Sequence, residues 1–329
     1  MSKKIMVARY RFIGDTILSI PFLTALRKTY PDAEIHYWVG KDAYDLMQRC
    51  PQIDQAICFE PRELGFWESV KRIKQQKYDT VYLLKRSFSS ALMTTLAGIP
   101  NRIGFNTEHR GLLLTRRIPY REFTHHEAQC FLDLLSDRPL EDWDDLDLTS
   151  WLTNVDTSNF SMGNGPHMVL HVTSTNPAKC WPLSHFETLA RQLLETYGGT
   201  IYALGTEKES AQYEKIRDRL PDNLKNNFTN WCGKTTLVES IALLKNMNLV
   251  VANDSGMIHM AAAVNTPTIA LFGPSDPIQW FPLNEKVVVM THPNLACQPC
   301  RMKISCHHQY PCLVEITPEQ VFKQCQTFL

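Results

Sequence analysis

Short runs of apolar residues alternate along this chain with longer stretches in which apolar side chains recur every three or four positions. The short runs predict β-strands, which in the first half cover residues 5–8, 35–39, 56–59 and 81–84. The longer stretches predict amphipathic helices, the first of which covers residues 15–29. Because strands that alternate with helices are typical of βαβ units, we expect the first half to form an α/β domain with a parallel sheet.

The alternation stops between residues 136 and 166, where Asp, Ser, Thr, Asn and Gly are frequent, and we place a linker between two domains there. It resumes with strands expected at 168–171, 200–204, 249–252 and 268–272. Helices are expected between them at 183–196, 208–219, 236–245 and 256–264. A chain of 329 residues also exceeds a typical single core. We therefore predict two Rossmann-like α/β domains, residues 1–160 and 161–329.

The composition is that of an ordinary globular protein, with 44% hydrophobic and 21% charged residues. The 34 basic and 34 acidic side chains balance, which argues against a nucleic-acid-binding protein because binding to phosphate backbones needs a cationic excess. No apolar run approaches the roughly 20 residues that span a bilayer, so we expect any membrane contact to be peripheral. Ten cysteines in a chain without an export signal indicate a reducing cytoplasm.

The strongest candidate site lies where the strand at 249–252 meets the helix at 256–264, across Asp254, Ser255 and Gly256. Ligands of open α/β sheets bind at the carboxyl ends of strands. The small residues there expose backbone N–H groups that a diphosphate can approach at the positive end of the helix dipole. His259, about one helical turn further on, could add a hydrogen bond or a charge. The alternative is that Asp254 and Ser255 only cap the helix and that His259 belongs to the core.

Two further strand ends carry polar residues that suit a phosphate or a sugar. Thr173 and Ser174 follow the strand at 168–171, and Lys179 lies shortly after them as a point charge for phosphate oxygens. Glu207, after the strand at 200–204, could hold ribose or sugar hydroxyls. Each has a plainer interpretation. Lys179 could be a solvated loop residue, and Glu207 could be an acidic residue at the start of a helix. The sequence contains neither GxGxxG nor a P-loop, which excludes the ordinary NAD and ATP motifs.

Asp15 begins the helix expected at 15–29, directly after Gly14. An aspartate at a helix start is usually a cap. The functional alternative is that Asp15 faces a cleft between the domains and acts as a general base.

The spacing of four cysteines near the C-terminus would allow them to bind one metal ion. They are Cys297, Cys300, Cys306 and Cys312. A regular zinc ribbon would show two Cys-x-x-Cys pairs, and only one is present here. A structural metal and buried free thiols both stay open, and neither interpretation gives these residues a catalytic role.

Four segments together form a recognisable pattern: residues 253–259, 266–274, 179–182 and the Gly14-Asp15 pair. This pattern resembles glycosyltransferase family 9, the ADP-heptose:lipopolysaccharide heptosyltransferases, and the resemblance covers nearly the whole chain. Residues 87–92 and 97–105, together with the terminal Cys-x-x-Cys region, are similar to the heptosyltransferase II branch of that family.

The resemblance implies a GT-B fold, in which two Rossmann-like domains face a central cleft. The C-terminal domain would bind the donor, ADP-heptose, and the N-terminal domain the acceptor, an acidic glycolipid. The reaction would invert the anomeric centre without a metal or other cofactor. The enzyme would be cytoplasmic and peripheral to the inner membrane.

Residue roles carry over position by position. Asp15 matches the proposed catalytic base and Lys179 the lysine that contacts the diphosphate, whereas the remaining donor-binding residues are Thr173, Ser174, Glu207, Asp254, Ser255, Gly256 and His259. Cys180 departs from the family, which commonly has Arg or His beside that lysine. Four cations of the N-terminal half could face the acidic acceptor or be ordinary surface charges: Lys85, Arg86, Arg102 and Arg110.

Two other functions fit the same residues. The first is a glycosyltransferase of the same fold that uses another nucleotide sugar. The second is a non-catalytic protein that binds a sugar nucleotide or a glycolipid.

Overall fold

The computed structural model describes residues 2–135, 146–302, 306 and 309–329. It divides into two compact units, Met1–Leu146 and Asp147–Leu329, so the division comes earlier in the chain than the boundary expected between 160 and 161. Part of the expected linker, residues 136–145, lies outside the described residues.

The first unit is built on a six-stranded parallel sheet in the part of the chain that the structure describes, with the strand order β3-β2-β1-β4-β5-β6. Its strands are β1 (Lys4–Ala8), β2 (Glu34–Val39), β3 (Gln55–Cys58), β4 (Thr80–Leu83), β5 (Asn101–Phe105) and β6 (Arg116–Ile118). Its α-helices are α1 (Ile13–Leu18), α2 (Ile20–Thr29), α3 (Tyr44–Met47), α4 (Pro61–Leu64), α5 (Phe66–Gln75), α6 (Phe88–Leu96) and α7 (Glu127–Asp133).

The second unit repeats this plan among its described residues, with the strand order β12-β11-β10-β7-β8-β9, again parallel. Its strands are β7 (His167–His171), β8 (Thr200–Ala203), β9 (Phe228–Asn230), β10 (Leu249–Asn253), β11 (Thr268–Leu271) and β12 (Val287–Met290). Its α-helices are α8 (Leu183–Tyr197), α9 (Ser210–Arg219), α10 (Leu237–Leu244), α11 (Gly256–Ala262), α12 (Pro277–Trp280), α13 (Pro311–Val314) and α14 (Pro318–Cys325).

Each sheet therefore has one point at which the strand order reverses direction. The chain starts in the middle, builds out to one edge, returns to the middle and builds out to the other edge. The reversal lies between β1 and β4 in the first unit and between β7 and β10 in the second. In such sheets ligands bind outside the carboxyl ends of the two strands that flank the reversal. The α/β class with parallel sheets predicted from the sequence is confirmed for both units.

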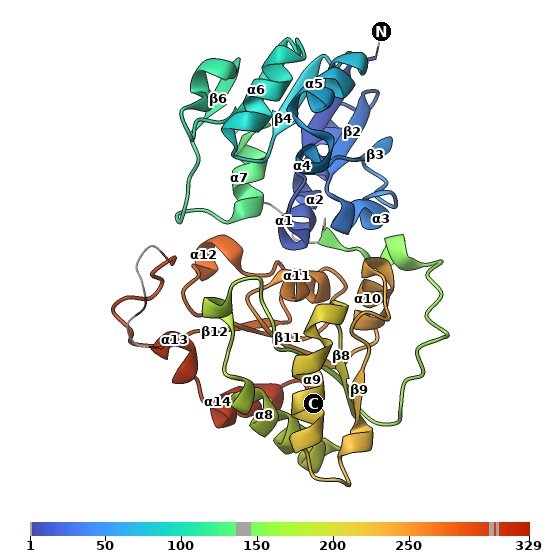
Figure 1. Cartoon of the computed structure of the whole chain (residues 1–329), viewed down its shortest axis with the longest axis vertical. Coiled ribbons are helices and arrows are strands. Elements are labelled where there is room, and N and C mark those ends of the chain that lie inside the picture. Colours follow the sequence, from blue (N-terminus) through green and yellow to red (C-terminus); the bar gives the residue numbers. More distant parts are fainter. Residues whose placement is uncertain (1, 136–145, 303–305, 307–308) are drawn as a thin grey trace. The chain divides into compact units, whose positions relative to one another are not determined.

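Helices cover both faces of each sheet (Figure 1). Successive side chains of a strand point to opposite faces, so a strand covered on both sides is apolar throughout. In β1, Met6 and Ala8 join the apolar layer that contains Val70 and Ile73 of α5, while Ile5 and Val7 are buried as well. The continuous apolar runs seen in the sequence follow from this double burial.

The helix expected at 15–29 is interrupted, and this expectation is corrected here. Ser19 ends α1 and precedes α2, and its hydroxyl donates to Thr16 O at 2.7 Å and lies 2.8 Å from the Tyr37 hydroxyl. The physical reason is Pro21, which has no N–H and whose ring would clash with the carbonyl four residues earlier. A break before Pro21 places it in the first turn of α2, where no N–H bond is needed.

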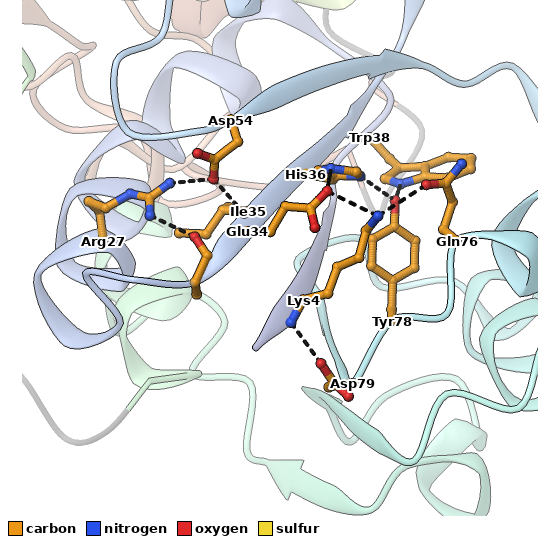
Figure 2. A network of polar contacts seen from close by, with 11 residues as sticks. Lys4, Arg27, Glu34, Ile35, His36, Trp38, Asp54, Gln76, Tyr78 and Asp79 are labelled. Carbon is orange, nitrogen blue, oxygen red and sulfur yellow. Dashed lines mark hydrogen bonds and ion pairs between the residues drawn. The ribbon is translucent and has the colours of Figure 1, made fainter. Parts of the chain in front are cut away.

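A polar network closes the amino end of the first sheet (Figure 2). The Tyr78 hydroxyl accepts from Trp38 Nε1 at 2.8 Å and lies 2.9 Å from His36 Nδ1. The Glu34 carboxylate can only accept, so His36 Nε2 donates to it at 2.8 Å, and in the neutral imidazole Nδ1 then accepts from the Tyr78 hydroxyl. Burial and the nearby Lys4 lower the pKa of His36, which favours this neutral form.

Candidate functional site

The junction of β10 and α11 is built by three consecutive polar residues with different partners. The Asn253 side chain accepts from the backbone N–H of Trp181 at 2.8 Å, which fixes the loop after β7 against β10. Ser255 is the N-cap of α11, because its hydroxyl accepts from Met257 N at 3.3 Å. Asp254 does not cap the helix, and its carboxylate points instead to a side chain of the neighbouring loop.

That partner is Lys179, whose ammonium lies 2.7 Å from Asp254 Oδ2. The Asp254 side chain is 7% exposed and that of Lys179 is 22% exposed, so the pair is largely withdrawn from water. The Ser174 hydroxyl also donates to the Asp254 carbonyl at 3.2 Å. The structure thus joins three predicted site residues from two distant segments, at the point where the strand order of the second sheet reverses.

Thr173 is hydrogen-bonded to Glu209, a carboxylate that the sequence analysis did not single out. Glu207 is exposed at the start of a 3-10 turn, whereas Glu209, two residues on, accepts a short hydrogen bond from the Thr173 hydroxyl. Glu209 also accepts from the Thr206 N–H at 2.6 Å and from its hydroxyl at 2.8 Å. Burial raises the pKa of Glu209, but these hydrogen bonds outweigh burial and lower it below the usual range.

Glu209 is the site residue that sequence reasoning missed, although a signal for it exists. The pattern Thr206-x-x-Glu209 is a capping box, in which the glutamate reaches back to the first residue of the turn. Gly205 makes room for this carboxylate, since a Cβ at that position would lie 2.7 Å from Glu209 Oε2. Glu209 therefore ties the turn after β8 to the carboxyl end of β7.

His259 lies in the middle of α11 and is 4% exposed. The placement fits the expected position one turn beyond the helix start. The burial is also what the plainer interpretation, a core histidine, predicts.

In the first unit, Asp15 lies in the first turn of α1 but does not cap it. The N-cap is Phe12, which makes no side-chain cap bond, and Asp15 Oδ2 lies 2.6 Å from a guanidinium nitrogen of Arg9. Both side chains are 10% exposed. Burial alone would lower the pKa of Arg9, and the Asp15 carboxylate outweighs it and raises that pKa. The capping interpretation of Asp15 therefore does not hold.

The turn that presents Asp15 is strained. Phe12 has a φ of 61°, in the left-handed region that bulky residues rarely adopt, and its ring is 58% exposed. Such a conformation costs on the order of 1–3 kcal/mol.

Two of the four cations that could face an acidic acceptor or be ordinary surface charges donate to backbone carbonyls in the structure. Arg110 is fully buried, and its guanidinium donates to the carbonyls of Phe105, Lys85 and Ser87. Arg102 donates to the carbonyls of Ile99, Pro100 and Leu113. Both arginines therefore hold loops together, because buried carbonyls need donors.

The four C-terminal cysteines are free thiols. Burial, and to a smaller extent the neighbouring thiols Cys300, Cys306 and Cys297, raise the pKa of Cys312 to about 11. Among the described residues, no group of three or more His, Cys, Asp or Glu side chains is arranged to hold a metal ion. In the same part of the chain, no helix is long and apolar enough to cross a membrane.

Comparisons with known proteins agree on one family. The profile of glycosyltransferase family 9 (heptosyltransferase) matches residues 66–310. Lipopolysaccharide heptosyltransferase 2 of Escherichia coli K12 is 28% identical, over 99% of this chain and 98% of its own length. Lipooligosaccharide heptosyltransferase 2 of Haemophilus influenzae is also 28% identical, over 99% of both chains.

Solved structures agree as well. The structure of the E. coli ADP-heptose lps heptosyltransferase II superposes with a TM-score of 0.80 at 26% identity, covering 99% of this chain and 98% of that one. A family 9 glycosyltransferase of Veillonella parvula has the same fold, with a TM-score of 0.81 at 20% identity over 100% of this chain and 98% of its own. The predicted family and the predicted GT-B fold class are confirmed.

Proposed function

Because the chain belongs to glycosyltransferase family 9 and is a glycosyltransferase, we propose that it transfers heptose from ADP-heptose to the inner core of a lipopolysaccharide. The transfer inverts the anomeric centre and needs no metal ion. The observation that carries the proposal is the Lys179–Asp254 pair beside the start of α11.

The second unit binds the donor diphosphate through this pair. The Lys179 ammonium has three N–H donors and gives one to Asp254, which leaves two for phosphate oxygens. Ser255 and Gly256 add backbone N–H groups at the positive end of the α11 dipole. Asp254 holds the lysine in place, so the positive charge is positioned before the donor arrives. Such preorganised charge stabilises a leaving group at no cost of reorganisation.

The first unit binds the acceptor and supplies the base. In the reaction, an acceptor hydroxyl attacks the anomeric carbon, its proton passes to Asp15, and the bond from that carbon to the diphosphate breaks to release ADP. The ion pair with Arg9 supports this role because it holds the Asp15 carboxylate in one orientation. Lys179 neutralises the charge that develops on the diphosphate, which is the task a metal ion performs in other transferases.

The acceptor is a glycolipid, so the enzyme works at the cytoplasmic face of the inner membrane as a peripheral protein. The positive groups of the first unit would meet the acidic head of that lipid.

Thermal unfolding with a panel of nucleotides tests the donor assignment. A ligand present at about 100 times its dissociation constant adds about 2.7 kcal/mol to the free energy of unfolding. We expect ADP to raise the melting temperature more than UDP or GDP at equal concentration. A preference for UDP would point to a transferase of the same fold with another sugar. Stabilisation by ADP without ADP release from ADP-heptose and acceptor would point to a non-catalytic binding protein.

A further inference from the structure

Asn253 is the last residue of β10 and is completely buried. Its side-chain oxygen accepts from the backbone N–H of Trp181 at 2.8 Å, and its side-chain nitrogen donates to the carbonyl of His171 in a longer contact of 3.5 Å. His171 ends β7, the strand that lies beside β10 at the reversal of strand order. One buried amide therefore joins the carboxyl ends of both strands to the loop that follows β7.

That loop contains a compact turn that carries Lys179. Residues Pro177–Lys179 form a 3-10 turn, in which the N–H of Lys179 donates to the carbonyl of Asn176 at 2.9 Å. The Asn176 side chain caps the turn by accepting from the N–H of Ala178 at 3.0 Å. Trp181 follows Lys179 by two residues, so a bond that holds the main chain of Trp181 also limits where Lys179 can lie.

The side chain of Trp181 anchors the end of this turn in the core of the second unit. It is 1% exposed, its Nε1 donates to the carbonyl of Ile316 at 2.8 Å, and its ring packs edge-on against Phe186 of α8. The bond from its backbone N–H to Asn253 is buried as well. Without the Asn253 side chain this N–H would lose that acceptor, and a buried donor without a partner destabilises the conformation that holds it.

The bond between Asn253 and Trp181 links the same two segments as the ion pair of the donor site. Asn253 directly precedes Asp254, whose carboxylate lies 2.7 Å from the Lys179 ammonium. The Ser174 hydroxyl, in the first part of the same loop, donates to the carbonyl of Asp254 at 3.2 Å. The loop after β7 is thus tied to the end of β10 on both sides of the ion pair, which fixes the distance that the lysine side chain must span.

We propose that Asn253 is a positioning residue for donor binding. Through the main chain of Trp181 it holds the turn that carries Lys179, so that the ammonium is in place before the diphosphate arrives. A long side chain that is already ordered loses less conformational freedom when a ligand binds than one that must be ordered by the ligand. The role rests on the proposed donor site for a nucleoside diphosphate, and it does not depend on which sugar is transferred.

A double-mutant cycle tests whether Asn253 acts through Lys179. Isothermal titration with ADP compares wild type, N253A, K179Q and N253A/K179Q. We expect N253A to bind ADP about 3- to 10-fold more weakly than wild type, because the lysine must then be ordered on binding. In the K179Q background the same change should cause no further loss, because the group through which Asn253 acts is absent.

Asn248 provides a matched control in the same pair of strands. Its side chain accepts from the backbone N–H of His167 at 2.8 Å, which ties β10 to β7 at their amino ends. N248A therefore removes a bond of the same kind at the opposite edge of the sheet, and it should bind ADP as wild type does. If N253A does not fold, N253S takes its place, because a serine hydroxyl is too short to reach the N–H of Trp181.

Two results overturn the proposal. One is ADP affinity of N253A within about twofold of wild type, even where urea unfolding shows that N253A is less stable, because a purely structural residue behaves in this way. The other is an equal loss of ADP affinity on changing Asn253 in the wild-type and K179Q backgrounds, which would show that Asn253 acts on the site without Lys179.

The same proteins separate this proposal from the proposed function. If the cycle shows the expected coupling but wild type transfers no heptose, the proposed function fails and the positioning role stands. If wild type transfers heptose but N253A binds ADP as wild type does, the positioning role fails and the function stands. If wild type binds UDP in place of ADP, the heptose assignment fails and the cycle with UDP decides the positioning role by the same criteria.

Discussion

Replacing Lys179 with glutamine removes two interactions of the lysine at once, and the structure predicts a separate size for each. One is the charge-assisted bond to the donor diphosphate, worth about 1.5–3 kcal/mol, so ADP should bind about 10- to 150-fold more weakly. The other is the bond to Asp254, whose side chain is 7% exposed and would be left as an unpaired charge.

The cost of that unpaired charge follows from its burial. Removing one partner of a fully buried ion pair costs about 3–5 kcal/mol. The Lys179 side chain is 22% exposed, so water reaches the pair and the expected loss in the free energy of unfolding is smaller, about 1–3 kcal/mol. Neutralising the aspartate as well, in K179Q/D254N, should recover most of this loss. It should not recover ADP affinity, because the cation stays absent.

Isothermal titration with ADP and urea unfolding of K179Q, D254N and the double variant measure both effects. Lys225 provides a matched control, since its ammonium lies 2.7 Å from Asp222 in an exposed pair, and K225Q should change neither quantity. The reasoning is refuted if K179Q binds ADP within about twofold of wild type, or if the double variant regains ADP affinity.

Further predictions concern the base, the turn after β8 and the polar network of the first sheet. D15N should lower kcat by about 10²- to 10⁴-fold in steady-state assays, while ADP affinity measured by titration stays unchanged. E209Q should lower the free energy of unfolding in urea by about 1–3 kcal/mol, whereas E207Q at the exposed neighbouring position should not. The pKa of His36 is lower in the native protein than in the unfolded chain. The unfolded chain therefore binds more protons below about pH 6.5, and the free energy of unfolding should fall as the pH falls below that value. Urea unfolding of wild type and H36Q between about pH 7.5 and 5.5 checks this, and the dependence should be weaker in H36Q.

Most of the fold could be predicted because central strands are buried on both faces and therefore apolar throughout. The strands that were not predicted include β6, β9 and β12, which are edge strands that pair with a neighbour on one side only. β6 and β9 are three residues long and carry Arg, Thr or Asn, so the pattern of a buried strand is missing. β5 escaped for a related reason, since it begins with Asn101 and Arg102.

The site was less predictable because it depends on contacts between distant segments. The sequence suggested Lys179 and Asp254 separately, as a phosphate ligand and a cap, but spacing along the chain cannot show that they bond to each other. The ion pair between Arg9 and Asp15 was also not predictable. In the sequence Arg9 is an ordinary cation at a strand end, and only the fold shows that it lies beside Asp15. The choice between Glu207 and Glu209 depends on a shift of two residues in one short turn, which only the backbone geometry decides.

The direct test of the central claim is a single-turnover reaction of the purified chain with ADP-heptose and a lipopolysaccharide inner-core acceptor, without added metal and with a chelator present. Mass spectrometry of the acceptor and quantification of ADP give both products. We predict the gain of one heptose on the acceptor, with an equal amount of ADP released, and the loss of both products in D15N. Transfer that stops with the chelator and returns with a divalent cation would contradict the metal-independent mechanism. Absence of transfer from ADP-heptose, together with transfer from another nucleotide sugar, would contradict the heptosyltransferase assignment.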